Sequence, residues 1–150
     1  MKPMASHTSS PEHESPPAPR SARVLAGLLG LMGVGHFVAT DFYALIVPRV
    51  LPAPRALVLV SGVAELACAA LLASKRTHRA GAWSAFALFL AVWPANVQMA
   101  LDGGAPGREG LLGSPVVAWL RVPLQVPLLY WTYRIASPRP SKDPGVHDPA

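Results

Sequence analysis

The sequence predicts an all-α integral membrane protein: a four-helix bundle with cytoplasmic N and C termini and disordered tails. Three observations predict this fold class. The chain contains four long apolar segments, each close to the twenty or so residues that a helix needs to cross a bilayer. None of them alternates between apolar and polar residues, and an open sheet is not viable in lipid. The basic residues are also divided unevenly among the connections between these segments.

The four segments are rich in Leu, Ala and Val and are separated by short stretches with Pro, Gly or charged residues. They run over about Ala22–Ala39, Ala56–Ala73, Ala80–Leu101 and Ser114–Tyr133. The first outer connection, residues 40–54, is too apolar for a free loop, and its three prolines exclude a long helix. We predict that it forms a short amphipathic segment that lies on the outer surface and caps the bundle.

The two ends of the chain differ sharply from this apolar centre. Residues 1–20 contain five prolines, and residues 138–150 contain four. Segments of this composition cannot bury enough apolar surface to offset their chain entropy. We therefore predict a disordered N-terminal tail (1–21), a four-helix transmembrane domain (22–135) and a disordered C-terminal tail (136–150).

The distribution of charge predicts the orientation in the membrane. Nine Lys and Arg residues precede or open the first segment, lie in the middle connection or follow the fourth segment, and three lie in the other two connections. Cytoplasmic loops carry the excess of basic residues, so both termini and the middle connection should be cytoplasmic. The net charge of +5 does not predict a nucleic-acid partner, because no basic stripe lies on a folded surface. The partner predicted here is the lipid bilayer.

The single cysteine limits the chemistry that the chain can perform. Cys68 excludes an internal disulfide, a CxxC redox pair and a cysteine-rich metal site. A free cysteine packs as a small apolar side chain, so we predict that Cys68 is a core residue. We expect no metal site.

Each apolar segment also carries a strongly polar residue: His36, Glu65, Asn96 and Arg121. Such residues are costly in a bilayer and normally face a partner or a water-filled cavity. With a rise of about 1.5 Å per residue, they gather between the midplane and the outer face. Other polar residues lie at similar depth. Ser61 is four residues from Glu65 and Gln125 is four residues from Arg121, so the members of each pair project from the same side of a helix. The candidate ligand-binding or structural polar cluster comprises His36, Ser61, Glu65, Asn96, Gln98, Arg121 and Gln125.

The roles of these residues remain open at the level of sequence. Glu65 and Arg121 are the acid and the base within the spans, and pairing them is the least costly arrangement. Such a pair could lock the bundle together or form a polar pocket or proton site. His36 could contact Glu65 or Asn96 through a hydrogen bond, carry a proton, or bind a metal.

Five motifs follow one another along the chain. They are His36-Phe37, Ile46-Val47-Pro48 with Leu51-Pro52, Ser61-Gly62-Val63-Ala64-Glu65-Leu66, Trp93-Pro94-Ala95-Asn96-Val97-Gln98-Met99-Ala100 and Leu120-Arg121-Val122-Pro123-Leu124-Gln125. In this order they make the chain resemble the DoxX family of small four-helix bacterial membrane proteins. The match covers about residues 22–134 and includes all four segments. One difference is Thr40, where many relatives have proline; this affects the outer connection only.

The resemblance implies a multi-pass protein of the bacterial plasma (inner) membrane, in a family linked in part to quinone-dependent redox enzymes. We do not carry a redox activity over, because the chain has no cysteine pair, cofactor fingerprint or haem ligand pair. The expected function is that of a binding or accessory subunit that is not catalytic alone. It has no tightly bound cofactor, and a quinone-like molecule or a membrane redox protein is the candidate ligand or partner. The alternatives are a small proton-coupled transporter, which would require a homo-oligomer, and a membrane subunit of a quinone-linked oxidoreductase.

Overall fold

The computed structural model describes residues 18–48, 50–104, 110 and 113–137, and these form helices without any strand. The predicted all-α class is therefore confirmed for the described chain. The helices are α1 (Arg20–Val38), α2 (Thr40–Ala44), α3 (Pro54–Ala73), α4 (His78–Leu101) and α5 (Pro115–Ala136). Each of the four long helices corresponds to one of the predicted apolar segments.

Prolines set several of the helix ends. Pro54 and Pro115 begin α3 and α5, a position at which proline costs no hydrogen bond. The Ser114 side chain caps α5 by accepting from the Val116 amide at 3.2 Å. Ser137 leaves the helix in an extended conformation, as expected for a residue that precedes a proline.

The predicted tail boundaries need a small correction. Helix α1 already begins at Arg20, directly after Pro19, and α5 continues to Ala136. Residues 20, 21 and 136 are therefore helical rather than part of the tails, because Pro19 and the proline after Ser137 mark the actual limits. Residues 1–17 and 138–150 of the predicted tails lie outside the described residues, and their disorder stays a prediction.

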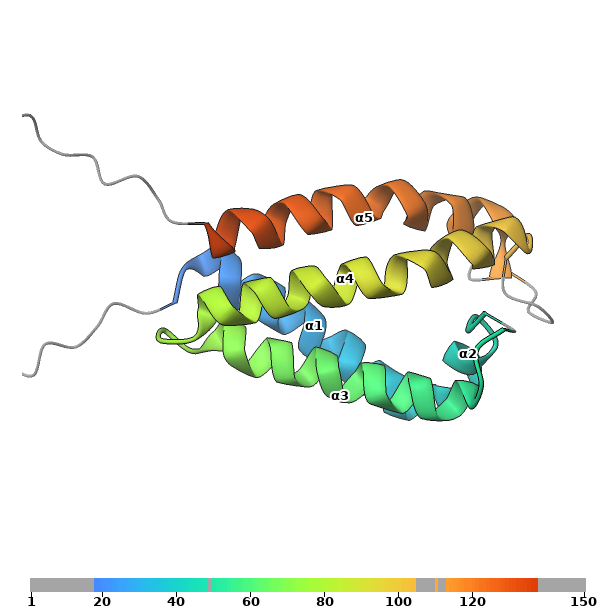
Figure 1. The fold of residues 1–150 in the computed structure, drawn as a ribbon, viewed down its shortest axis with the longest axis horizontal. Helices are drawn as coiled ribbons and strands as arrows, with labels where there is room; N and C mark the ends of the chain where they lie inside the picture. Colours follow the sequence, from blue (N-terminus) through green and yellow to red (C-terminus); the bar gives the residue numbers. More distant parts are fainter. Residues whose placement is uncertain (1–17, 49, 105–109, 111–112, 138–150) are drawn as a thin grey trace, which may run out of the picture.

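The four long helices lie side by side along the long axis of the molecule (Figure 1). Helix α1 packs on α3, α3 packs on α4, and α4 packs on α5. The first residue of α1 and the last residue of α5 lie at the same end, and α2 lies at the opposite end (Figure 1). The loop between α3 and α4 is at the end where α1 begins.

The packing differs between the two ends of the molecule. Near the start of α1, a core built mainly from alanines joins all four long helices; it consists of Ala22, Leu25, Ala26, Leu29, Cys68, Leu72, Ala82, Ala85 and Ala136. Cys68 is buried there, as predicted. Near α2, a second core joins α4 to α5, and Ile46 from the first outer connection packs against it. This contact agrees with the capping role predicted for that connection.

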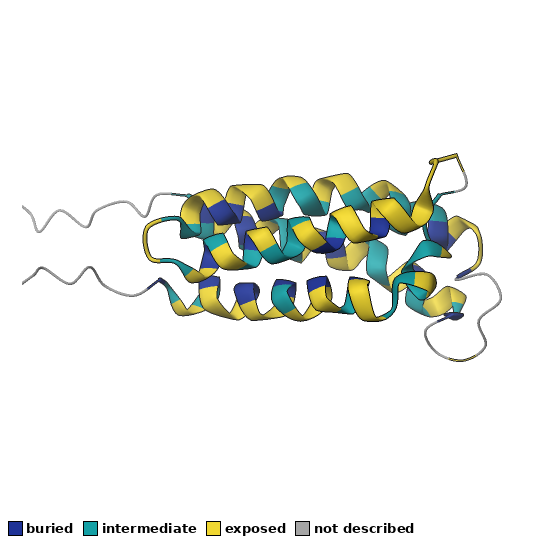
Figure 2. Cartoon of the chain, turned by 90° about the horizontal axis from the view of Figure 1, so that it is seen from below, coloured by how far each residue is buried: buried dark blue, intermediate teal, exposed yellow. Residues whose placement is uncertain are grey.

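Many large apolar side chains of the helices are exposed. Figure 2 shows that exposed and buried residues both occur along each long helix. The helices Arg20–Val38, Pro54–Ala73 and His78–Leu101 are long and apolar enough to cross a membrane by length and composition. The prediction of four such segments is thus confirmed for three. Helix α5 is long enough at 22 residues, but Arg121, Gln125 and its prolines lower its hydropathy.

Candidate functional site

The His36 and Glu65 side chains meet between α1 and α3. His36 Nδ1 lies 3.2 Å from Glu65 Oε2, and the two side chains are 11% and 12% exposed. The Oε2 atom is buried and makes no well-aligned hydrogen bond, and the contact becomes an ion pair when His36 is protonated. The structure therefore realises one of the alternatives considered for His36, a direct contact with Glu65.

Two glycines allow this contact by bringing the helix backbones close together. A Cβ atom on Gly62 would lie 2.8 Å from the His36 Cβ, and one on Gly33 would lie 3.0 Å from the Gly62 carbonyl oxygen. Gly33 and Gly62 each precede a member of the pair by three residues, which places them on the same helix face. The glycine contact thus sets the separation at which His36 can reach Glu65.

The main chain fixes which ring nitrogen of His36 carries a proton. Nδ1 lies 2.9 Å from the Met32 carbonyl oxygen, which can only accept, so Nδ1 must be the donor. Glu65 Oε2 lies 3.2 Å from the same nitrogen but is not aligned with its N–H bond. The described polar contacts of the ring both use Nδ1, which leaves Nε2 to interact with a ligand or water.

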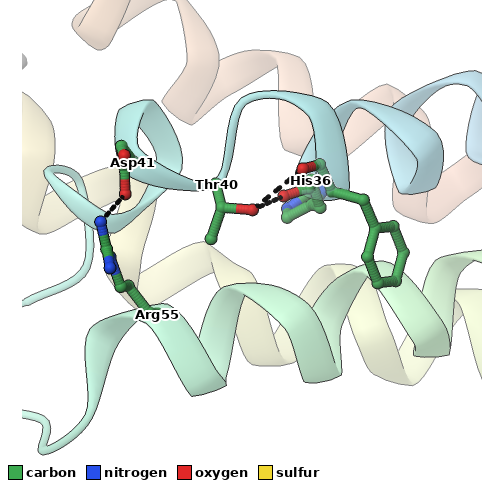
Figure 3. Close-up of polar contacts among 5 residues, drawn as sticks. His36, Thr40, Asp41 and Arg55 are labelled. Atoms are coloured by element: carbon green, nitrogen blue, oxygen red, sulfur yellow. Dashed lines mark hydrogen bonds and ion pairs between the residues drawn. The ribbon is translucent and has the colours of Figure 1, made fainter.

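The short helix α2 covers the His36 ring. Tyr43 stacks on it with ring centroids 4.2 Å apart and an interplanar angle of 16°. The Thr40 hydroxyl donates to the His36 carbonyl oxygen at 2.7 Å and turns the chain at the end of α1. An ion pair between Asp41 and Arg55 then ties α2 to the start of α3 (Figure 3). This pair is exposed, so it contributes little stability by itself.

A second polar pair lies between α4 and α5. Asn96 Nδ2 donates to Gln125 Oε1 at 3.4 Å, and Gln125 Nε2 donates to the Phe89 carbonyl oxygen at 2.6 Å. Gln125 is buried. Pro94 interrupts the hydrogen-bond ladder of α4 close to this carbonyl. The amides therefore satisfy each other and the main chain, which makes this pair a structural link between the two helices.

The predicted ion pair between Glu65 and Arg121 is wrong. Glu65 contacts His36, and the Arg121 guanidinium instead points to the Met99 sulfur at 3.9 Å. Arg121 is on α5, which packs chiefly on α4, whereas Glu65 is on α3 and faces α1. The depth of the two residues in their helices was compatible with pairing, but the order of the helices separates them.

The remaining candidates do not join either pair. Ser61 is half-buried one turn before Glu65 and takes part in no described hydrogen bond. Gln98 donates to Asp102 within its own helix at 2.9 Å. The seven predicted residues thus divide into a His36–Glu65 pair, an Asn96–Gln125 pair, Arg121 and two outlying residues. In the described part of the chain, no hydrogen bond or ion pair connects the two pairs.

Three participants were not among the predicted site residues. Tyr43 stacks on His36, a place that follows from the fold of α2. The Met99 sulfur is the described polar contact of Arg121. The Trp93 Nε1 atom is buried without an acceptor among the described residues. The available sequence signal was spacing, because Phe89, Trp93 and Asn96 share one face of α4. No set of three or more His, Cys, Asp or Glu side chains in the described residues could hold a metal ion.

Comparison with known families matches residues 25–136 to a domain of unknown function, DUF8561. The chain belongs to this family. The DUF8561 match covers most of α1 and all of α2 to α5, including both polar pairs, but it assigns no activity to them. No curated protein and no solved structure matches the chain. These comparisons do not connect the DUF8561 domain to the DoxX family, so that resemblance remains a prediction.

Proposed function

We propose that this protein is a DoxX-like, multi-pass protein of the bacterial plasma membrane, in which α5 crosses the bilayer together with α1, α3 and α4. Three of these helices have the length and composition of membrane spans. Helix α5 lies along α4 over most of its length (Figure 1). Both termini and the α3–α4 connection then lie in the cytoplasm, as the distribution of basic residues indicates.

Within this membrane domain, the proposed function is that of a binding or accessory subunit with its site at His36 and Glu65. The observation that carries this proposal is the buried contact of 3.2 Å between the two side chains. An acid and a base that face each other in a membrane helix pair are costly to retain without a role. When His36 is protonated opposite the Glu65 carboxylate, its free Nε2–H can donate to the carbonyl oxygen of a quinone-like ligand. A membrane redox protein is the corresponding partner.

The same pair also favours a second candidate, a small proton-coupled carrier. A carboxyl and an imidazole are both groups that can exchange protons, and here His36 Nδ1 lies 3.2 Å from Glu65 Oε2. A carrier needs a titrating group that can be reached from at least one side. Under this candidate function, Glu65 is the group that carries the proton and His36 is the group that exchanges it.

The first test is mass spectrometry of small molecules that co-purify with the full-length protein in detergent. The binding proposal expects a bound molecule in the wild type that is lost in Glu65→Gln and His36→Phe. Gln98→Ala is the matched control, because Gln98 is a polar helix residue that binds Asp102 instead of the pair. An empty wild-type protein, or a ligand retained in both pair variants, contradicts the binding proposal.

The second candidate is tested with the same variants in sealed lipid vesicles. A proton-coupled carrier moves protons across the vesicle membrane, and Glu65→Gln should abolish this flux while Gln98→Ala retains it. Absence of flux in the wild type removes the carrier. A flux that persists in Glu65→Gln places the proton path elsewhere in the molecule.

A further inference from the structure

We propose that Arg121 binds the phosphate group of an anionic phospholipid at the end of the molecule where α4 ends and α5 begins. This inference goes beyond the function proposed for His36 and Glu65 and does not involve that pair. It rests only on the proposed placement of the helices in a membrane.

The first step is that the charged Arg121 guanidinium has only a weak hydrogen-bond acceptor as its described partner. The side chain is half-buried, and its described polar contact is the Met99 sulfur at 3.9 Å. A thioether sulfur is a poor acceptor, whereas a guanidinium has five donors and remains charged. A cation removed from water normally has an anionic or strongly accepting partner.

The second step is that the described part of the chain offers no acid to neutralise Arg121. Its three acidic residues are each engaged with another side chain. These contacts are Asp41 with Arg55, Glu65 with His36, and Asp102 with Gln98. Asp102 lies only three residues beyond Met99, yet it accepts from its own helix.

The third step concerns the position of Arg121 in the helix. It follows the first residue of α5 by six positions, which corresponds to about 9 Å along the axis. From this depth, an arginine can extend its charged group to the level of the lipid head groups. The amino-terminal end of α5 adds a positive partial charge on the same side. A phosphate accepts paired hydrogen bonds from a guanidinium, so an anionic head group fits both the charge and the geometry.

The test measures binding of phosphatidylglycerol and phosphatidylcholine to the full-length protein in detergent, by native mass spectrometry and by lipid-induced stabilisation against heat. The wild type should prefer phosphatidylglycerol. Arg121→Gln should weaken phosphatidylglycerol binding about fivefold or more, the effect of one arginine at a membrane surface. Arg121→Lys should retain part of the preference, because it keeps the charge and loses only the paired donors.

The matched control is Arg55→Gln. It removes one positive charge at the same end, but from an arginine that already faces Asp41. Equal losses in Arg55→Gln and Arg121→Gln would show attraction by net charge alone and overturn the site. An unchanged preference in Arg121→Gln also overturns it. Equal stabilisation by inorganic phosphate would overturn the assignment to a lipid.

Failure of this proposal is distinguishable from failure of the His36–Glu65 function. Glu65→Gln should leave the preference for phosphatidylglycerol unchanged, and Arg121→Gln should leave co-purification of the other ligand unchanged. Loss of the lipid preference in Glu65→Gln contradicts the separation of the two sites.

Discussion

The His36 and Glu65 side chains stabilise each other at a buried position, where either one alone would lack its polar partner. Removing one of them leaves a buried polar group without its partner, and the cost then depends on whether the other is still present. This dependence can be measured, because the two side chains meet directly at 3.2 Å.

A double-mutant cycle should detect this coupling. We expect His36→Gln and Glu65→Gln to be coupled by about 0.6 to 1.7 kcal/mol in the free energy of unfolding, the range of polar contacts between membrane helices. Glu65→Gln and Arg121→Gln should instead be additive within about 0.5 kcal/mol, since the two side chains share no contact. The measurement is reversible unfolding in mixed detergent micelles. Coupling of Glu65 to Arg121 rather than to His36 would refute the geometry.

At the residue scale, the depth of the polar residues along their helices was predictable from the sequence. Their contact partners were only partly predictable. Counting helical rise placed Glu65, His36 and Arg121 in the same half of the molecule. The contact of His36 with Glu65 was one of the predicted alternatives, but the pairing of Glu65 with Arg121 was wrong. Four helices of similar length can be arranged in several neighbour orders, and the rotation of each helix about its axis is set by packing. A list of residues at similar depth does not contain that information.

At the scale of helix pairs, the backbones of α1 and α3 approach each other closely at Gly33 and Gly62. A Cβ atom on Gly62 would meet three groups at 2.8 to 3.1 Å, among them the His36 Cβ and the Gly33 carbonyl. Such atoms cannot move aside without separating the helices. The same contact sets the reach of His36 to Glu65, so packing and the polar site depend on each other.

The glycine contact predicts opposite effects for two similar substitutions. Gly62→Ala should destabilise the protein by about 1–3 kcal/mol through overpacking. Gly27→Ala should stabilise it by about 0.5–1 kcal/mol, because a Cβ there meets nothing within 4 Å and alanine favours the helix. Thermal unfolding of both variants in one detergent provides the comparison. A neutral Gly62→Ala would mean that the backbones are farther apart than described.

The helices themselves were largely predictable. Their ends lie within about three residues of the predicted limits, because proline and charged residues mark them in the sequence. The apolar first outer connection indicated a short capping segment, and α2 with Ile46 fills this role. The stacking of Tyr43 on His36 could not be predicted, because it depends on how α2 folds back over α1.

For the whole molecule, the decisive question is whether α5 crosses the membrane. Three helices have the composition of spans, and a crossing α5 returns the chain to the side on which α1 begins. The chain has one cysteine, the buried Cys68. Its replacement by serine therefore gives a cysteine-free background in which single cysteines can be placed.

Labelling of these single cysteines with a membrane-impermeant thiol reagent should report the topology. Cysteine at Ser74 or Ser137 should react only from the cytoplasmic side, and cysteine at Gly103 only from the outside. All three positions lie at helix ends, beyond the last helical residue. Labelling of the Ser137 and Gly103 positions from the same side would show that α5 does not cross, and would overturn the four-span arrangement.

The close contact of α1 with α3 also limits how two copies of this protein could associate. Membrane helices often dimerise through rows of small residues, because these let two backbones touch. In this chain, Gly33 already packs against Gly62, and Gly35 packs against Tyr43. Of the glycine row on α1, Gly27 is the position with open space around it. A second copy that docked against α1 would therefore meet its amino-terminal half, on the cytoplasmic side of the proposed topology, far from the turn that carries His36.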